Sequence, residues 1–206
     1  MHSAVAFEIR SFSLAIADTA FQALYLRHKL AQPDKPITTK EPFLIWGGSS
    51  SVGLYAIQLA SLSGQSPLFV TARESVQLTW PLTGYTVITT ASPKNFDLVK
   101  SFGASAVYDY NDADTPSKIA SDYPDLARGM DCVSEKGTTL LIAKSFAEKK
   151  GTIITILPVK DEALDKDFPE VHHEFTLVYT VLGDEFNFGP MKFEANREDF
   201  EAIKEW

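Results

Sequence analysis

A Gly/Ser-rich turn at residues 47–53 contains the residue types best suited to bind a ligand. The apolar run Phe43-Leu-Ile-Trp46 leads into this turn, and an apolar segment with helical spacing follows it. A turn without bulky side chains lets the backbone approach a pyrophosphate, and the helix that follows presents free N–H groups and the positive end of its dipole. The residue order therefore predicts a site for dinucleotide phosphates.

The match to the dinucleotide-binding fingerprint is incomplete. Gly48, Ser50 and Gly53 occupy the three glycine positions of G-x-G-x-x-G, so a serine replaces the middle glycine. A Gly/Ser turn that only joins a strand to a helix would have a similar sequence. We favour phosphate binding because the segments before and after the turn fit a strand and a helix.

The residues after the second expected strand indicate which dinucleotide would bind. NAD-preferring sites carry an acidic residue there for the ribose 2′-hydroxyl, whereas this chain has Ala91, Ser92, Pro93 and Lys94. A hydroxyl and an ammonium group suit a 2′-phosphate, and no carboxylate repels it. We therefore expect NADPH as the cofactor; the alternative is that Lys94 is an ordinary solvated lysine.

Other candidate residues favour structural interpretations. Tyr25 and Lys29 have the Y-x-x-x-K spacing of short-chain dehydrogenases, but they precede the glycine turn, and we interpret this spacing as coincidence. We expect Cys132 to be a buried structural residue and Glu135 and Lys136 to form a solvated turn. No metal site is expected, and no general acid or base is assigned.

Composition excludes several partners. A net charge of −8 and a pI near 5.0 argue against nucleic acid as a partner. A single cysteine allows no intrachain disulfide, so we expect a reducing compartment, the cytoplasm. Charged residues interrupt the apolar N-terminus, which resembles neither a signal peptide nor a membrane span.

Alternating strands and helices are expected to position the candidate residues. Strands are predicted at residues 43–46, 85–90, 106–108, 130–133, 151–157 and 175–182, and helices at residues 14–30, 52–63, 95–101, 117–123 and 138–148. The charged run at residues 160–167 is interpreted as an exposed loop. This alternation predicts an α/β fold, a Rossmann-like doubly wound parallel sheet with flanking helices.

Residues 65–84 interrupt this alternation. The position that reads the ribose lies about 20 residues beyond the fingerprint, but Gly48 and Ala91 are 43 positions apart. Removing residues 65–84 would leave an ordinary connection of helix, glycine and strand. We favour the hypothesis that this irregular segment translates an unspliced, in-frame intron; the alternative is a genuine surface insertion, which loop entropy tolerates.

Several ordered motifs carry a family resemblance, at residues 44–53, 85–95, 101–104, 109–111 and 131–137. With these motifs the chain resembles the medium-chain dehydrogenase/reductase superfamily. Within the superfamily it is most similar to the zinc-independent enoyl reductases that act in trans with fungal polyketide synthases. The resemblance extends from residue 14 to the C-terminus, apart from residues 65–84.

The resemblance implies a set of cofactor-binding positions. Ser92 and Lys94 are the implied 2′-phosphate ligands, with Tyr110 stacking or hydrogen bonding nearby, and residues 180–183 are implied to approach the nicotinamide through backbone groups unless they are a plain strand end. The full implied set is Gly48, Ser49, Ser50, Ser51, Val52, Gly53, Ser92, Lys94, Asn95, Tyr110, Leu157, Val181, Leu182 and Gly183.

The resemblance also implies a domain organisation. Residues 1–40 form an N-terminal helix and linker, residues 41–160 the NAD(P)-binding domain with its insertion, and residues 161–206 a loop, a returning strand and a truncated C-terminal segment. Family members begin with a GroES-like substrate domain, for which this chain has no room, so we expect the cofactor domain alone.

The expected activity is hydride transfer from NADPH to an α,β-unsaturated thioester or carbonyl, with a small-molecule or carrier-bound enoyl substrate and a polyketide synthase as a candidate partner. Two alternatives stay open: a catalytically silent NADP-binding module, and a non-functional product of a truncated gene model.

Overall fold

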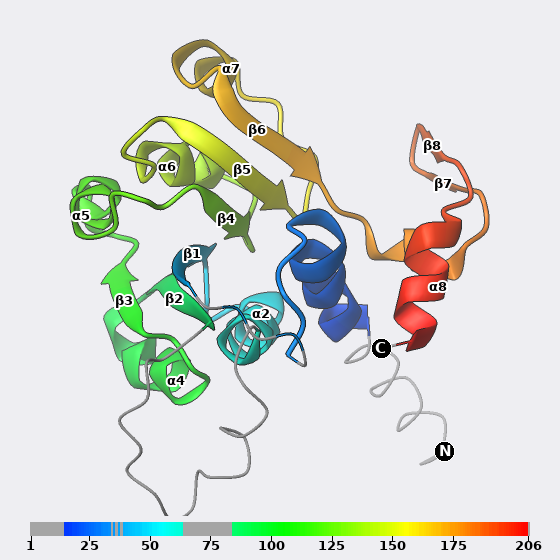
Figure 1. Ribbon diagram of the computed structural model, residues 1–206. Coiled ribbons are helices and arrows are strands. Elements are labelled where there is room, and N and C mark those ends of the chain that lie inside the picture. The colour runs from blue at the N-terminus through cyan, green and yellow to red at the C-terminus, as the bar shows by residue number, and fades with distance from the viewer. Residues whose placement is uncertain (1–14, 34, 36, 38, 64–83, 206) are drawn as a thin grey trace, which may run out of the picture.

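A six-stranded parallel sheet forms the centre of the protein (Figure 1). The computed structural model describes residues 15–33, 35, 37, 39–63 and 84–205. The strands lie in the order β3-β2-β1-β4-β5-β6, which is the Rossmann order. Their bounds are β1 Lys40–Trp46, β2 Gly84–Ala91, β3 Ala106–Asp109, β4 Arg128–Asp131, β5 Lys150–Thr155 and β6 Glu170–Phe175. The predicted fold class is therefore confirmed.

Helices cover both faces of the sheet and continue beyond its last strand (Figure 1). An N-terminal helix occupies residues 15–27, and its second half is the π-helix η1, Gln22–Arg27. The α-helices that follow are α2 Ser51–Leu62, α4 Phe96–Ser101, α5 Thr115–Asp122, α6 Thr138–Lys144, α7 Glu162–Asp167 and α8 Arg197–Glu205. Two 3₁₀ helices, η2 Pro93–Asn95 and η3 Val178–Leu182, and a hairpin of β7 Phe186–Phe188 and β8 Met191–Phe193 complete the described elements.

The alternation of side chains along β1 shows how the core is divided between the two faces. Phe43 and Ile45 belong to one buried cluster, with Ile57 of α2 and with the N-terminal helix. Leu44 belongs to the other cluster, with Ile142 of α6. Because successive side chains of a strand point to opposite faces, one apolar run contacts both helical layers.

The predicted strand at residues 175–182 is wrong. The last strand of the sheet is β6, which ends at Phe175, and Val178–Leu182 form the 3₁₀ helix η3. β6 is an edge strand in which only Val171 is buried, and it contains two adjacent histidines, so it lacks the continuous apolar run of a central strand. The apolar residues after it cover the end of the sheet instead of extending it.

The exposed loop predicted at residues 160–167 is also wrong, because this segment contains the helix α7. Asp161 caps α7, and its carboxylate accepts hydrogen bonds from the amides of Ala163 and Leu164 at 3.0 and 3.2 Å. The buried side chain of Leu164 fixes the helix on the core. One apolar residue and one cap are thus enough to order this charged segment.

The predicted insertion, residues 65–84, lies outside the described residues except for its last position. Gly84 begins β2, pairs with Lys40 of β1 and has a φ of +106°. The structure therefore assigns Gly84 to the sheet, and the boundary predicted there was one residue too late.

Within the described residues, no helix combines the length and the apolar character that crossing a membrane requires.

Candidate functional site

The glycine turn joins the carboxyl end of β1 to the first turn of α2. Its backbone is tied to the neighbouring strand β2, because the amides of Gly47 and Gly48 donate to the Oγ1 and the carbonyl oxygen of Thr90, both at 3.0 Å. Gly47 has a φ of +81°, a region that glycine adopts without strain. The turn is thus anchored at the switch point of the sheet, where β1 lies between β2 and β4.

Two glycines in this turn have no space for a side chain. A Cβ on Gly53 would lie 2.5 Å from the carbonyl oxygen of Gly47, and a Cβ on Gly48 would lie 2.0 Å from Oγ1 of Thr89. The close contact of Gly53 is with backbone, which cannot move aside easily. The start of α2 therefore packs directly on the turn.

Ser50, which stands at the middle glycine position, is the N-cap of α2. Its Oγ accepts a hydrogen bond from the amide of Gly53 at 3.1 Å, and its backbone is extended, with a φ of −72°. Serine is a favoured N-cap residue, and no left-handed backbone is needed here. The turn also contains Ser49, and α2 begins with Ser51 and Val52. The N–H groups of these first helical residues have no acceptor within the helix.

Ser92, Lys94 and Asn95 follow β2 at the same edge of the sheet. Asn95 Nδ2 donates to Ser92 Oγ at 3.3 Å, which links the two ends of η2. The side chain of Lys94 is exposed, and among the residues that the structure describes it forms no ion pair. Tyr110, which is 47% exposed, follows the β3 residue Asp109, the partner of Ala91 in the sheet, so both strands end beside one another.

A buried carboxylate that sequence reasoning missed organises the loop after β4. Asp131 accepts hydrogen bonds from the amides of Val133 and Ser134 at 3.0 and 2.8 Å, and from the hydroxyls of Thr138 and Thr139 at 2.8 and 2.7 Å. These bonds draw the loop and the start of α6 together. The signal in the sequence is an Asp at the end of a strand, followed after seven residues by Thr-Thr.

The Asp131 loop is also fixed to the next strand. Ser134 has a left-handed φ of +57°, and its Oγ accepts from the amide of Ile156 at 2.9 Å, just beyond β5. Leu157 follows with 39% of its surface exposed. Leu157 and the Asp131 loop thus border the same edge of the sheet as the glycine turn.

The last three predicted positions, Val181, Leu182 and Gly183, lie in and after η3. Leu182 is 62% exposed, whereas Val181 is buried. Gly183 has a φ of +80°, and a Cβ there would lie 2.8 Å from the ring of Phe200 in α8. This turn follows the carboxyl end of β6 and is therefore at the same edge of the sheet as the other predicted positions.

A buried polar cluster holds the inner side of η3. It consists of Gln22, Arg27, Thr176, Thr180 and Asp199, and we call it the Gln22 cluster. Gln22 Nε2 donates to Thr180 Oγ1 at 2.6 Å and to Asp199 Oδ2 at 2.8 Å, while its Oε1 accepts from Thr176 Oγ1 at 2.5 Å. Sequence reasoning missed this cluster because its members lie far apart along the chain.

Comparisons with known proteins decide the family. No family model matches the chain. The dual trans-enoyl reductase/FAD-dependent monooxygenase tazHJ of Aspergillus terreus is 37% identical over 188 residues, which are 90% of this chain and 24% of that protein. The trans-enoyl reductase FSL5 of Gibberella zeae is 35% identical over 159 residues, which are 77% of this chain and 38% of that protein. The chain belongs to the trans-enoyl reductase family. It spans less than half of the length of these two relatives.

Solved structures agree with this family's fold. The CurK enoyl reductase superposes with a TM-score of 0.56 at 19% identity, over 81% of this chain and 43% of that chain. Mycobacterial Rv1454c, crystallised with NADPH, gives the same score and identity over 80% of this chain and 44% of that chain. At this identity, these likenesses show the fold alone.

Two other sequence candidates take structural roles in this domain. The hydroxyl of Tyr25 lies 2.7 Å from Ser63 Oγ, whereas Lys29 is exposed and pairs with Glu198, so the Y-x-x-x-K residues do not converge. Cys132 is buried, and burial raises the pKa of its thiol well above the usual value. The predicted burial of Cys132 is confirmed.

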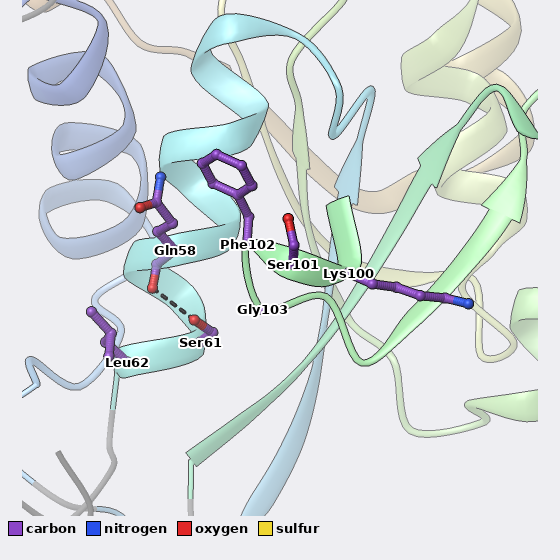
Figure 2. A pocket seen from close by; sticks show the side chains of 7 residues that line it. All are labelled: Gln58, Ser61, Leu62, Lys100, Ser101, Phe102 and Gly103. Atoms are coloured by element: carbon purple, nitrogen blue, oxygen red, sulfur yellow. Dashed lines mark hydrogen bonds between the residues drawn. The ribbon is translucent and has the colours of Figure 1, made fainter. Parts of the chain in front are cut away.

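The pocket in Figure 2 lies away from the predicted cofactor positions. It is lined by the last residues of α2 and α4, whereas the glycine turn is at the first residue of α2. Its side chains are Gln58, Ser61, Leu62, Lys100, Ser101 and Phe102, with Gly103. Lys100 extends away from the others, and no charged group points into the pocket (Figure 2).

Proposed function

We propose that this domain binds NADPH and serves as the cofactor half of an enoyl reductase. The observation that carries the proposal is the glycine turn at the switch point of the sheet. Lys94 follows the neighbouring strand, and among the described residues it forms no ion pair. The family membership supports the reaction type, and the NADPH in the mycobacterial structure supports the cofactor.

The residues of the turn fit a dinucleotide. Side chains on Gly48 or Gly53 would fill the space that the turn and α2 leave between them. The amides of Ser51 and Val52 would hold the pyrophosphate, because the first N–H groups of a helix are free to donate. Ser92 and Lys94, with Asn95 and Tyr110 next to them, would hold the 2′-phosphate.

When bound, NADPH supplies the hydride that reduces the β-carbon of an α,β-unsaturated thioester or carbonyl. The protein's own contribution is to position the cofactor and to shape its surroundings. The exposed side chains of Leu157 and Leu182 would provide an apolar border on the nicotinamide side, and the backbone around Val181 and Gly183 would fix the ring's orientation. We assign no general acid or base.

The proposal extends to the substrate and the domain organisation. The relatives' names indicate an enoyl substrate. The sequence resemblance supports an enoyl group on a small molecule or a carrier, with a polyketide synthase as the partner. We propose residues 41–160 as the principal cofactor-binding unit, with residues 1–40 and 161–206 as flanking segments, and the cytoplasm as the compartment.

Calorimetric titration with NADPH and with NADH tests the cofactor assignment. We expect the unmodified protein to bind NADPH at least about tenfold more tightly, because a charge-assisted contact contributes roughly 1.4 kcal/mol or more. Lys94→Glu should remove this preference, because it replaces the attraction by repulsion. Lys100→Glu changes the charge equally at the far end of α4 and should leave the preference intact. Equal affinities in the unmodified protein would contradict the proposal.

A turnover assay tests the reaction itself. NADPH oxidation is followed spectroscopically with a crotonyl-type thioester as acceptor. Oxidation that depends on the thioester supports the reductase, whereas binding without turnover supports a silent NADP-binding module. A protein that neither binds NADPH nor unfolds cooperatively would support the non-functional product.

A further inference from the structure

We propose that the Gln22 cluster positions the backbone of residues 177–183 and thereby sets the affinity for the nicotinamide half of the cofactor. Gln22, Thr180 and Asp199 are the positioning residues. This inference rests on the proposed function, because it assumes that residues 181–183 face the nicotinamide.

The cluster joins three parts of the chain that are distant in sequence. Gln22 is in the π-helix η1, Thr180 is in η3, and Asp199 is in the first turn of α8. Thr180 Oγ1 also donates to Asp199 Oδ2 at 2.5 Å, so the three side chains form a closed triangle of hydrogen bonds. In Figure 1 the N-terminal helix and α8 stand beside one another at the end of the sheet.

Because the cluster is buried, its hydrogen bonds restrict the geometry of the three side chains. Gln22 is 0% exposed, Asp199 1% and Thr180 8%. A buried polar group without a partner is costly, so each member holds the others in one geometry. An apolar contact at the same place would tolerate small displacements of η3, whereas the triangle does not.

Arg27 completes the charge balance of the cluster. Its Nη1 and Nη2 donate to the two carboxylate oxygens of Asp199 at 2.9 and 2.5 Å. Burial opposes ionisation of Asp199, but the hydrogen bonds from Arg27 and Thr180 outweigh it and hold the pKa of this carboxyl below its usual value. A charged carboxylate therefore sits directly under η3.

The other side of η3 is partly exposed. Leu182 is 62% exposed, and Tyr179, which is 49% exposed, packs against Phe186 and Phe188 of the β7–β8 hairpin. The polar side chain of Thr180 instead points into the cluster. The left-handed Gly183 then packs on Phe200 of α8. The position of this outer surface is thus set by the bonds beneath it.

The test compares NADPH with adenosine 2′,5′-bisphosphate, which has the adenine, ribose and 2′-phosphate but no nicotinamide. Affinities for both are measured calorimetrically in the unmodified chain and in Thr180→Val, which keeps the shape but removes the hydroxyl. We expect NADPH to bind roughly tenfold more weakly to the variant, while the bisphosphate affinity changes less than about twofold. Thr180→Ser, which keeps the hydroxyl, should restore NADPH binding.

Two controls separate positioning from general loss of stability. Ile119→Val removes one methylene from α5 on the opposite face of the sheet and should leave the ratio of the two affinities unchanged. Arg27→Lys, at the partly exposed border of the cluster, keeps the charge but loses the paired hydrogen bonds. It should lower NADPH affinity selectively even if Thr180→Val does not fold.

The outcomes distinguish this inference from the proposed function. If the unmodified chain binds neither ligand, the proposed function is wrong. If it binds both but NADPH no more tightly than the bisphosphate, or if the variants weaken both ligands equally or neither, the positioning role of the Gln22 cluster is wrong and the cofactor site stands.

Discussion

Ser50 and Gly53 both contribute to the start of α2. The hydroxyl of Ser50 accepts a hydrogen bond from the amide of Gly53, and the N–H groups of Ser51 and Val52 remain available for a ligand. Gly53 in turn lets the helix approach the carbonyl oxygen of Gly47. A serine in place of the middle glycine is therefore compatible with phosphate binding, because the backbone at this position is extended.

Gly53→Ala should disrupt the turn. The added Cβ would lie 2.5 Å from the carbonyl oxygen of Gly47, and backbone on both sides leaves little room to relax. We expect destabilisation of about 1–3 kcal/mol by overpacking and loss of NADPH binding, measured by urea unfolding and calorimetry. Leu62→Ala, at the exposed last position of the same helix, serves as the control. Unchanged affinity in Gly53→Ala would mean that the turn is looser than the structure indicates.

Asp131→Asn should loosen the loop between β4 and α6. An amide can replace only one of the two carboxylate oxygens as an acceptor, so at least one of the four donors loses its partner. We expect a loss of about 1–3 kcal/mol of folding stability, together with faster hydrogen exchange at Val133 and Ser134. Unaltered exchange at these amides would show that other contacts hold the loop.

At the scale of elements, His28 joins the end of the N-terminal helix to the sheet. Its Nε2 lies 2.9 Å from the carbonyl oxygen of Gly129, and its ring packs edge-on against Phe43 with the centroids 4.9 Å apart. Burial lowers the pKa of His28 to about 4, and the nearby Arg128 acts in the same direction. The imidazole is therefore neutral in the folded protein at neutral pH.

Stability should fall as the pH drops from about 6.5 to about 4. In this window the unfolded chain binds a proton at His28 and the folded chain does not, and the difference corresponds to about 3 kcal/mol. Below the folded pKa no further loss comes from this group. Urea unfolding across the window, compared with His28→Gln, isolates the effect, because the other titrating groups are common to both proteins. Parallel pH profiles for the two proteins would refute it.

The sequence predicted the central elements well and the last third poorly, for a physical reason. β1, β2 and β4 are buried on both faces and therefore have apolar runs that periodicity detects. β6 and α7 each bury only one side, and their polar residues, such as His172 and Asp165, obscure the pattern. The N-terminal helix was predicted, but ordinary helical spacing does not distinguish the π-helical geometry of its second half, η1.

The same reasoning separates the predictable and unpredictable parts of the candidate site. Residues 47–53 lie within one turn, so their spacing alone predicts the turn and the helix start that the structure has. The Asp131 bonds and the Gln22 cluster depend on side chains that meet only after the sheet has formed. Gln22 and Asp199 are 177 positions apart, and neither belongs to a local motif.

At the scale of the whole molecule, residues 65–83 lie between α2, which follows the glycine turn, and the strand β2. Deleting them, while keeping Gly84 as the first residue of β2, should leave the free energy of unfolding unchanged or raise it. A shorter connection between α2 and β2 costs less loop-closure entropy. Chemical denaturation of the deletion variant checks this, and a clearly lower midpoint would show that the segment contributes to the core.

The Gln22 cluster also sets an order of events during synthesis. A ribosome makes the N-terminal helix first, yet the buried amide of Gln22 acquires its partners only when Thr176, Thr180 and Asp199 have left the exit tunnel. Contacts over such sequence distances form late, because chain entropy opposes them. Until residue 199 has been made, the amide of Gln22 can bond only to water, so the first helix cannot dock on η3 and α8. During that interval the undocked helix would be accessible to proteases and chaperones.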